Sequence, residues 1–131
     1  MQSRARVLIV EDDNAMAQMC AKLIRRRGHS AVIARSSEDA LALIRGGARV
    51  DVVISDVQMP HMTGIELLAG IRQLDPELPI ILMTGYATMI SPGQANTLGA
   101  TDYLTKPFDA EAFIGSLERA IRKRERTAIL P

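Results

Sequence analysis

The feature that most constrains the fold is an alternation, along the whole chain, between short apolar runs and longer segments with helical periodicity. The apolar runs occupy residues 7–10, 31–34, 52–54, 80–83 and, more weakly, 103–104. The strongest runs are continuously apolar, as expected for strands that are covered on both faces of a parallel sheet. The alternation therefore predicts a doubly wound α/β fold with five parallel strands and right-handed connections.

Helices are predicted between these runs from apolar spacing and from residues that begin or end helices. The first expected helix runs from about Met16 to Ile24 and stops at Gly28, and the second runs from a cap at Ser36 through Ile44. The third runs from about Gly64 to Leu74, and the fourth from a cap at Ser91 to Leu98. The last follows a cap at Asp109 and carries an apolar stripe from Phe113 to Ile121. Pro92 suits the first helical position after Ser91, and residues 85–90 are predicted to form a loop.

Size, charge and cysteine content narrow the class of protein. The 131 residues are the size of one domain, and 47% of them are apolar, which excludes general disorder. No apolar run approaches the ~20 residues of a membrane span, and the start of the chain lacks a signal peptide's apolar stretch, so a cytoplasmic protein is predicted. The single cysteine, Cys20, is expected in the core, and the net charge of +1 argues against a dedicated nucleic-acid-binding surface.

Polar residues follow four of the five predicted strands. They are Glu11, Asp12 and Asp13 after the first strand, Asp56 after the third, Thr84 after the fourth, and Lys106 with Pro107 after the fifth. In a doubly wound sheet these positions meet at the carboxyl edge, where ligands bind. Oxygen ligands without histidine or cysteine suit Mg²⁺, and a hydroxyl and an ammonium facing that ion suit the oxygens of a phosphoryl group.

Each of these features also has a simpler structural explanation. Asp12 and Asp13 would serve as helix caps, Asp56 would be a loop carboxylate before Pro60, and the residues around Thr84 and Lys106 would form ordinary turns. Taken singly, each simpler explanation is favoured. What those explanations account for poorly is the coincidence of all four features at one edge of the sheet.

The ordered set of motifs resembles the receiver domain of two-component response regulators, over about residues 6–122. The residues that carry the resemblance are Glu11, Asp12 and Asp13, then Asp56 with Met59 and Pro60, then Thr84, Gly85 and Tyr86, then Gly99 and Tyr103, and finally Lys106, Pro107 and Phe108. The resemblance implies a flavodoxin-like fold with five strand–helix units and the strand order 2-1-3-4-5.

The resemblance also implies a role for each polar residue at the sheet edge. Asp56 would be the phosphoacceptor, and Asp56, Asp12 and the backbone carbonyl of Gln58 would bind Mg²⁺, with Glu11 acting through water. Lys106 and Thr84 would contact the phosphoryl oxygens. Asp13 is given only a secondary role.

Further positions match residues that, in this family, transmit the conformational change or set the lifetime of the acyl phosphate. Tyr103 resembles the switch aromatic, and the Lys106–Pro107 bond resembles a bond that is cis in the family. Gln58 and Tyr86 would tune the lifetime of the acyl phosphate. A departure from the usual pattern is the segment 88–93, with Pro92, where family members usually run a regular helix next to the surface that passes on the signal.

These observations predict a phosphorylation-dependent signalling switch, and not an enzyme that acts on a metabolite. The implied partners are a sensor histidine kinase or histidine phosphotransfer protein, and a downstream protein or an output domain that is missing here. The resemblance leaves a phosphorylation-dependent dimer open, and neither nucleic acid nor membrane is expected to bind this domain. Residues 1–122 would form the receiver, with 123–131 as a tail or the start of a linker.

Two other functions stay open. A receiver-shaped adaptor would act without phosphorylation, but such proteins tend to lose an acid, the hydroxyl or the lysine, and all are present. A Mg²⁺-dependent phosphohydrolase with an aspartyl nucleophile would need a second acid two residues after Asp56, and Gln58 stands there.

Overall fold

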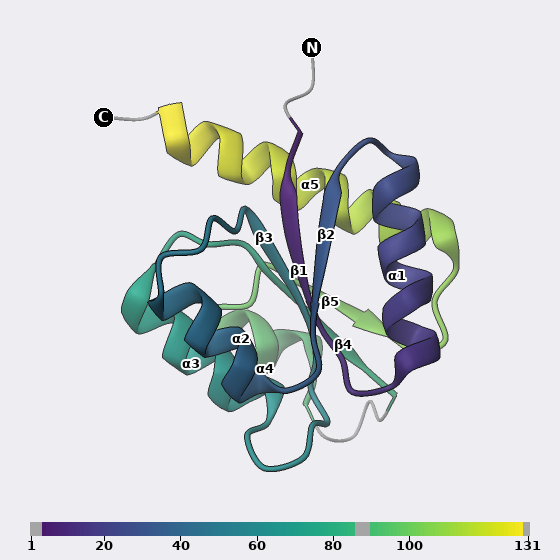
Figure 1. Ribbon diagram of the computed structural model, residues 1–131. Helices are drawn as coiled ribbons and strands as arrows, with labels where there is room; N and C mark the ends of the chain where they lie inside the picture. Colours follow the sequence, from purple (N-terminus) through teal and green to yellow (C-terminus); the bar gives the residue numbers. More distant parts are fainter. Residues whose placement is uncertain (1–3, 86–89, 130–131) are drawn as a thin grey trace.

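Five parallel strands form one sheet in the order β2-β1-β3-β4-β5 in a computed structural model that describes residues 4–85 and 90–129 (Figure 1). The strands are β1 (Arg6–Val10), β2 (Ser30–Ala34), β3 (Val52–Asp56), β4 (Ile80–Thr84) and β5 (Asp102–Thr105). Every neighbouring pair is parallel. The predicted fold class and strand order are therefore confirmed.

Within the described residues, five helices cover the two faces of the sheet. They are α1 (Asn14–Arg26), α2 (Ser37–Arg45), α3 (Gly64–Leu74), α4 (Pro92–Thr97) and α5 (Ala110–Ile129). Figure 1 shows α1 and α5 on one face, and α2, α3 and α4 on the other. Alternate strand residues belong to different cores: Val7 and Ile9 pack with α1 and α5, whereas Leu8 and Val10 pack with the other three helices. This two-sided burial explains why the strands are continuously apolar.

The predicted helix caps are present in the structure. The Ser36 hydroxyl accepts a hydrogen bond from the Asp39 amide at 3.0 Å, and the Asp109 carboxylate accepts one from the Ala112 amide at 2.7 Å. At the start of α4, Ser91 forms a reciprocal capping box with Gln94, and Pro92 occupies the first turn. The sequence patterns therefore located these helix starts to within about one residue.

The last helix is longer than its predicted apolar stripe. Phe113, Leu117 and Ile121 are buried against the sheet as expected, but α5 continues through Ile129. The predicted boundary after residue 122 therefore lies inside a helix, and the division of the chain there remains a prediction. Although α5 has 20 residues, neither it nor any other helix in the described part of the chain is long and apolar enough to cross a membrane.

Cys20 packs in the core between α1 and the sheet, as predicted. Its side chain is fully buried, and this burial raises the pKa of the thiol to about 12. Since the thiolate is the reactive form of cysteine, Cys20 is a packing residue and not a nucleophile.

Candidate functional site

Three carboxylates meet where β1 and β3 end. Glu11 and Asp12 follow β1, and Asp56 is the last residue of β3, the strand next to β1. One carboxylate oxygen from each residue lies within 4.8 Å of the others. Glu11 and Asp56 are buried and Asp12 is exposed. Parallel pairing thus brings together acids that are 45 positions apart in the chain, as the sequence predicted.

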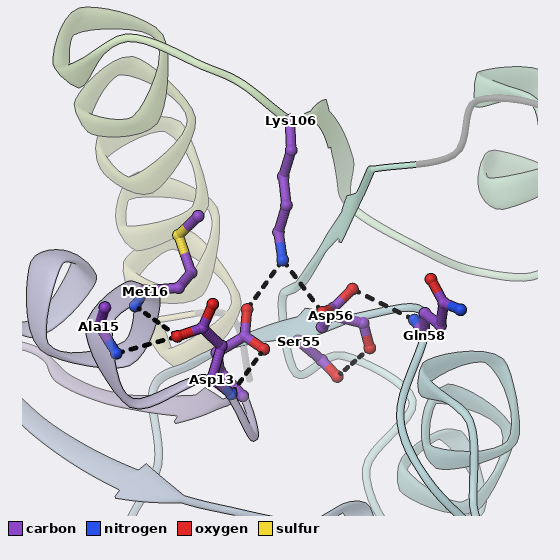
Figure 2. Close-up of polar contacts among 8 residues, drawn as sticks. Asp13, Ala15, Met16, Ser55, Asp56, Gln58 and Lys106 are labelled. Atoms are coloured by element: carbon purple, nitrogen blue, oxygen red, sulfur yellow. Dashed lines mark hydrogen bonds and ion pairs between the residues drawn. The ribbon is translucent and has the colours of Figure 1, made fainter.

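Lys106 reaches into this carboxylate cluster from the link between β5 and α5. Its Nζ donates to Glu11 Oε1 at 2.9 Å and to Asp56 Oδ2 at 3.0 Å (Figure 2). Its backbone N–H donates to the Thr84 carbonyl at 2.7 Å, which ties the base of the side chain to the end of β4. The ammonium is therefore the counter-charge shared by the two buried acids.

Burial and the contact between Glu11 and Lys106 act in opposite directions on the pKa values of these two residues. Burial raises the pKa of Glu11 above the usual value, and the charge of Asp56 adds to this, while the hydrogen bond from Lys106 opposes it. Burial alone would lower the pKa of Lys106, but its contacts with Glu11 and Asp56 outweigh burial and raise it. The lysine therefore stays charged, and the cluster keeps excess negative charge beside it.

The loop after β3 holds the Asp56 carboxylate from the other side. Asp56 Oδ1 accepts from the backbone N–H of Gln58 at 3.1 Å, so both carboxylate oxygens have a donor. The amide of Gly64 donates to the Val57 carbonyl at 2.9 Å and brings α3 against this loop. A Cβ on Gly64 would lie 2.2 Å from the Asp56 carbonyl oxygen. Only glycine allows this approach, so Gly64 helps to fix where Asp56 sits.

The other predicted residues lie at different places around the edge. Thr84 is fully buried at the end of β4, next to the strand that carries Asp56. The hydroxyl of Tyr103 donates to the Ile90 carbonyl at 2.5 Å, on the α4 side of the sheet. The Lys106–Pro107 peptide bond is cis. Tyr86 and the rest of residues 86–89, within the predicted loop, lie outside the described residues.

Asp13 acts as the cap of α1. Its Oδ1 accepts from the amides of Ala15 at 3.0 Å and of Met16 at 3.4 Å (Figure 2). The simpler explanation weighed for the acids after β1 therefore holds for Asp13. It does not account for Glu11 or Asp12, whose carboxylates belong to the cluster with Asp56.

Two features of the site were missed by the sequence argument. Lys106 was expected to face phosphoryl oxygens, and its contact with Glu11 was not foreseen because nothing in sequence spacing indicates a pair 95 residues apart. The close approach of Gly64 to the Asp56 carbonyl was also missed, although the helix start at Gly64 was predicted. Thr63 and Glu66 form a capping box, and this spacing marks the start of α3 directly after the Asp56 loop.

The donor set of the cluster fits a hard divalent cation. It offers only oxygens, at the spacing that a single ion can bridge, and it carries more negative charge than one ammonium balances. Magnesium takes one or two carboxylates and leaves positions for water or for phosphate oxygens. With a lysine ammonium in contact with Asp56, the arrangement has the parts needed to bring a phosphoryl group to that carboxylate.

Comparisons with known proteins agree with this geometry. The family model "Response regulator receiver domain" matches residues 7–118. The response regulator protein FleR of Pseudomonas aeruginosa is 42% identical over 115 residues, which are 88% of this chain and 24% of FleR. The DNA-binding transcriptional regulator NtrC of Azospirillum brasilense is 34% identical and is matched over 98% of this chain and 27% of its own length. This chain thus spans about a quarter of the curated relatives that it matches.

Two solved structures of response regulator proteins show the same fold over almost their whole length. A CheY-like response regulator receiver domain protein from Methanospirillum hungatei superposes with a TM-score of 0.87 at 27% identity, covering 95% of this chain and 99% of that one. The chemotaxis response regulator CheY4 of Vibrio cholerae gives a TM-score of 0.80 at 33% identity, covering 90% and 99%. Sequence motifs, fold, site geometry and family model agree, and the chain belongs to the response regulator receiver domain family.

Proposed function

We propose that this receiver domain is a phosphorylation-dependent signalling switch that takes a phosphoryl group on Asp56. The observation that carries the proposal is the setting of the Asp56 carboxylate. The residue is 7% exposed at the carboxyl edge of the sheet, and its carboxylate lies 3.0 Å from the Lys106 ammonium and beside two further acids. The donor would be the phosphohistidine of a sensor histidine kinase or of a histidine phosphotransfer protein.

The transfer is a nucleophilic substitution at phosphorus. A carboxylate oxygen of Asp56 forms the new P–O bond, the P–N bond to histidine breaks, and the released imidazole nitrogen keeps the electron pair and takes up a proton. The Lys106 ammonium, which holds Asp56 Oδ2 and Glu11 Oε1 at rest, then has a phosphoryl oxygen as its partner. Since the product is an acyl phosphate on the protein itself, the domain acts as a substrate and not as an enzyme for metabolites.

Magnesium fits the same edge. Asp12, Asp56 and the Gln58 carbonyl would hold the ion, with Glu11 acting through water, and when bound it would supply positive charge to the transferring phosphoryl oxygens. Gln58 and Tyr86 would tune the lifetime of the acyl phosphate. These assignments rest on the acidic cluster and on membership of the family.

The signal would leave the site through Thr84 and Tyr103. A phosphoryl group adds charge that one arrangement of Thr84 and Lys106 satisfies best, and that arrangement gains population. Tyr103 would follow by changing its contact with the Ile90 carbonyl, and the surface of α4, β5 and α5 would change with it. The altered surface would bind a downstream protein, an output domain or a second copy in a phosphorylation-dependent dimer, all in the cytoplasm.

Intact-mass measurement tests the proposal. We expect incubation with acetyl phosphate and Mg²⁺ to add the mass of one phosphoryl group to the wild type and to Asp51→Asn, and none to Asp56→Asn. Asp51 is the matched control because it lies just before the same strand but forms an ion pair with Arg49, Nη2 to Oδ2 at 3.1 Å, away from the cluster. A phosphoryl adduct that persists in Asp56→Asn would contradict the assignment.

A further inference from the structure

The short helix α4 is held mainly at its ends. It has six residues, and Ala95 is its one buried side chain. Before its first turn, the carbonyl of Ile90 accepts the hydrogen bond from the Tyr103 hydroxyl. After its last turn, the carbonyl of Gly99 accepts hydrogen bonds from Arg72 of α3. The position of α4 therefore depends on two side chains that lie outside it.

The contact at the C-terminal end is the stronger of the two. The Arg72 guanidinium donates to the Gly99 carbonyl through Nε at 3.1 Å and Nη2 at 2.7 Å, and its Nη1 donates to the carbonyls of Leu78 at 2.6 Å and Asp75 at 3.2 Å. Within the described residues, all of its hydrogen bonds go to backbone carbonyls. One planar side chain thus joins the end of α3, the turn before β4 and the turn after α4.

Gly99 is shaped to receive this side chain. Its φ is +101°, a conformation that suits glycine, and a Cβ there would lie 3.2 Å from Arg72 Nε. The chain after it is fixed as well: the Thr101 amide donates to the Ile80 carbonyl at 2.7 Å, and the Ile80 amide donates to Thr101 Oγ1 at 3.0 Å. The C-terminal end of α4 is therefore bonded to both α3 and β4.

The other end of α4 depends on a residue that the proposed switch moves. Between Tyr103 and Ile90 the structure shows one hydrogen bond, whereas Arg72 donates two to Gly99 and two more to the carbonyls of Asp75 and Leu78. Arg72 lies at the amino edge of the sheet, next to the starts of β4 and β5, and so is remote from Asp56 at the carboxyl edge. A change at the phosphorylation site would reach the Tyr103 contact and leave the Arg72 contacts in place.

We propose that Arg72 is a positioning residue that anchors the C-terminal end of α4, so that the change made by phosphorylation is confined to the N-terminal end and α4 turns about Gly99. This inference rests on the proposed function. The anchor gives α4 a fixed C-terminal end and a movable N-terminal end, so the docking surface changes most near the N-terminal end of α4.

Amide hydrogen exchange followed by NMR tests this proposal, with beryllofluoride and Mg²⁺ as the phosphoryl mimic. In the wild type we expect the mimic to change exchange about tenfold at Gln94 and Ala95, and less than about twofold at Ala100 and Thr101. In Arg72→Met the response to the mimic should spread to Ala100 and Thr101 with a similar size. Arg72→Lys should restore part of the difference, because an ammonium still reaches a carbonyl.

The control is Arg25→Met, which removes another arginine that donates to a carbonyl, that of Ala31 at 3.1 Å on the far edge of the sheet. It should leave the pattern in α4 unchanged. Where the mimic does change the amides next to Asp56, a wild-type response that is equal at both ends of α4, or an Arg72→Met effect that is the same with and without the mimic, would overturn the anchor. Failure of the proposed function is distinguishable, since the mimic would then leave the amides next to Asp56 and Lys106 unchanged as well. In that case Arg72→Met alone must speed exchange at Ala100 and Thr101 about tenfold for the anchor to stand.

Discussion

Replacing Lys106 with methionine should lower the free energy of unfolding by about 3 kcal/mol at neutral pH without Mg²⁺. The reason is that Lys106 is the counter-charge of Glu11, whose side chain is 1% exposed, and of Asp56, whose side chain is 10% exposed. Methionine keeps most of the length of the side chain but leaves two carboxylates facing each other in a desolvated site. Urea unfolding of the wild type and the variant measures the difference.

Magnesium and acid should each recover part of this loss. A bound Mg²⁺ supplies the missing positive charge, so saturating Mg²⁺ should stabilise Lys106→Met more than the wild type. The pKa of Glu11 is raised by burial, so protonation of Glu11 favours the folded state as the pH falls through that raised value, and the difference from wild type should shrink there. In the wild type, the raised pKa of Lys106 means that its contribution is complete below its usual pKa and is lost as the pH rises through the folded value.

Lys22→Met is the matched control, because Lys22 is exposed on α1. Its substitution should change the free energy of unfolding by less than about 0.5 kcal/mol, with no dependence on Mg²⁺. An equal Mg²⁺ response in Lys106→Met and wild type would mean that the ammonium and the metal do not serve the same carboxylates.

The second large effect is expected from Gly64→Ala. The added methyl would lie 2.2 Å from the Asp56 carbonyl oxygen and 2.9 Å from Val57 Cα, and both of these are backbone atoms. Either α3 or the Asp56 loop must shift, at a cost of about 3 kcal/mol in unfolding free energy. Displacement of Asp56 should also slow its phosphorylation by acetyl phosphate about 100-fold. Urea unfolding and the rate of mass gain measure the two effects.

Gly93→Ala controls for the glycine-to-alanine change itself. A Cβ there would meet its nearest neighbour, Ser91 Oγ, at 3.9 Å, and the residue lies within α4. Alanine should therefore be neutral or stabilise the fold by up to about 1 kcal/mol. A Gly64→Ala protein with wild-type stability and phosphorylation rate would show that α3 adapts freely, and that Gly64 does not position Asp56.

The fold was predictable because local and global patterns agree. Two-sided burial produces continuous apolar strands, and residues such as Ser36 and Ser91 mark helix starts by bonds within the next turn. The extent of α5 was less predictable. Its apolar stripe ends at Ile121, but backbone hydrogen bonds continue the helix through a charged segment that has no periodic signal.

The composition of the site was predictable, but its internal pairing was not. Strand ends in a parallel sheet share an edge, so Glu11, Asp12, Asp56 and Lys106 were expected to lie close together. Which of them touch depends on side-chain reach and on the balance of charge. The contacts of Arg72 were also not predictable from the sequence. Its partners are backbone carbonyls in two other turns, and because every residue type supplies a carbonyl, no sequence pattern marks these partners.

The central claim is that the Asp56 carboxylate itself becomes the acyl phosphate. Borohydride reduction of the phosphorylated protein converts an acyl phosphate to an alcohol, so an aspartyl phosphate becomes homoserine. Trypsin should release residues 50–72 as one peptide that contains both Asp51 and Asp56, and tandem mass spectrometry can tell the two positions apart. The account predicts homoserine at position 56 with Asp51 intact. Homoserine at position 51, or a phosphorylated protein with no reduced residue in this peptide, would contradict it.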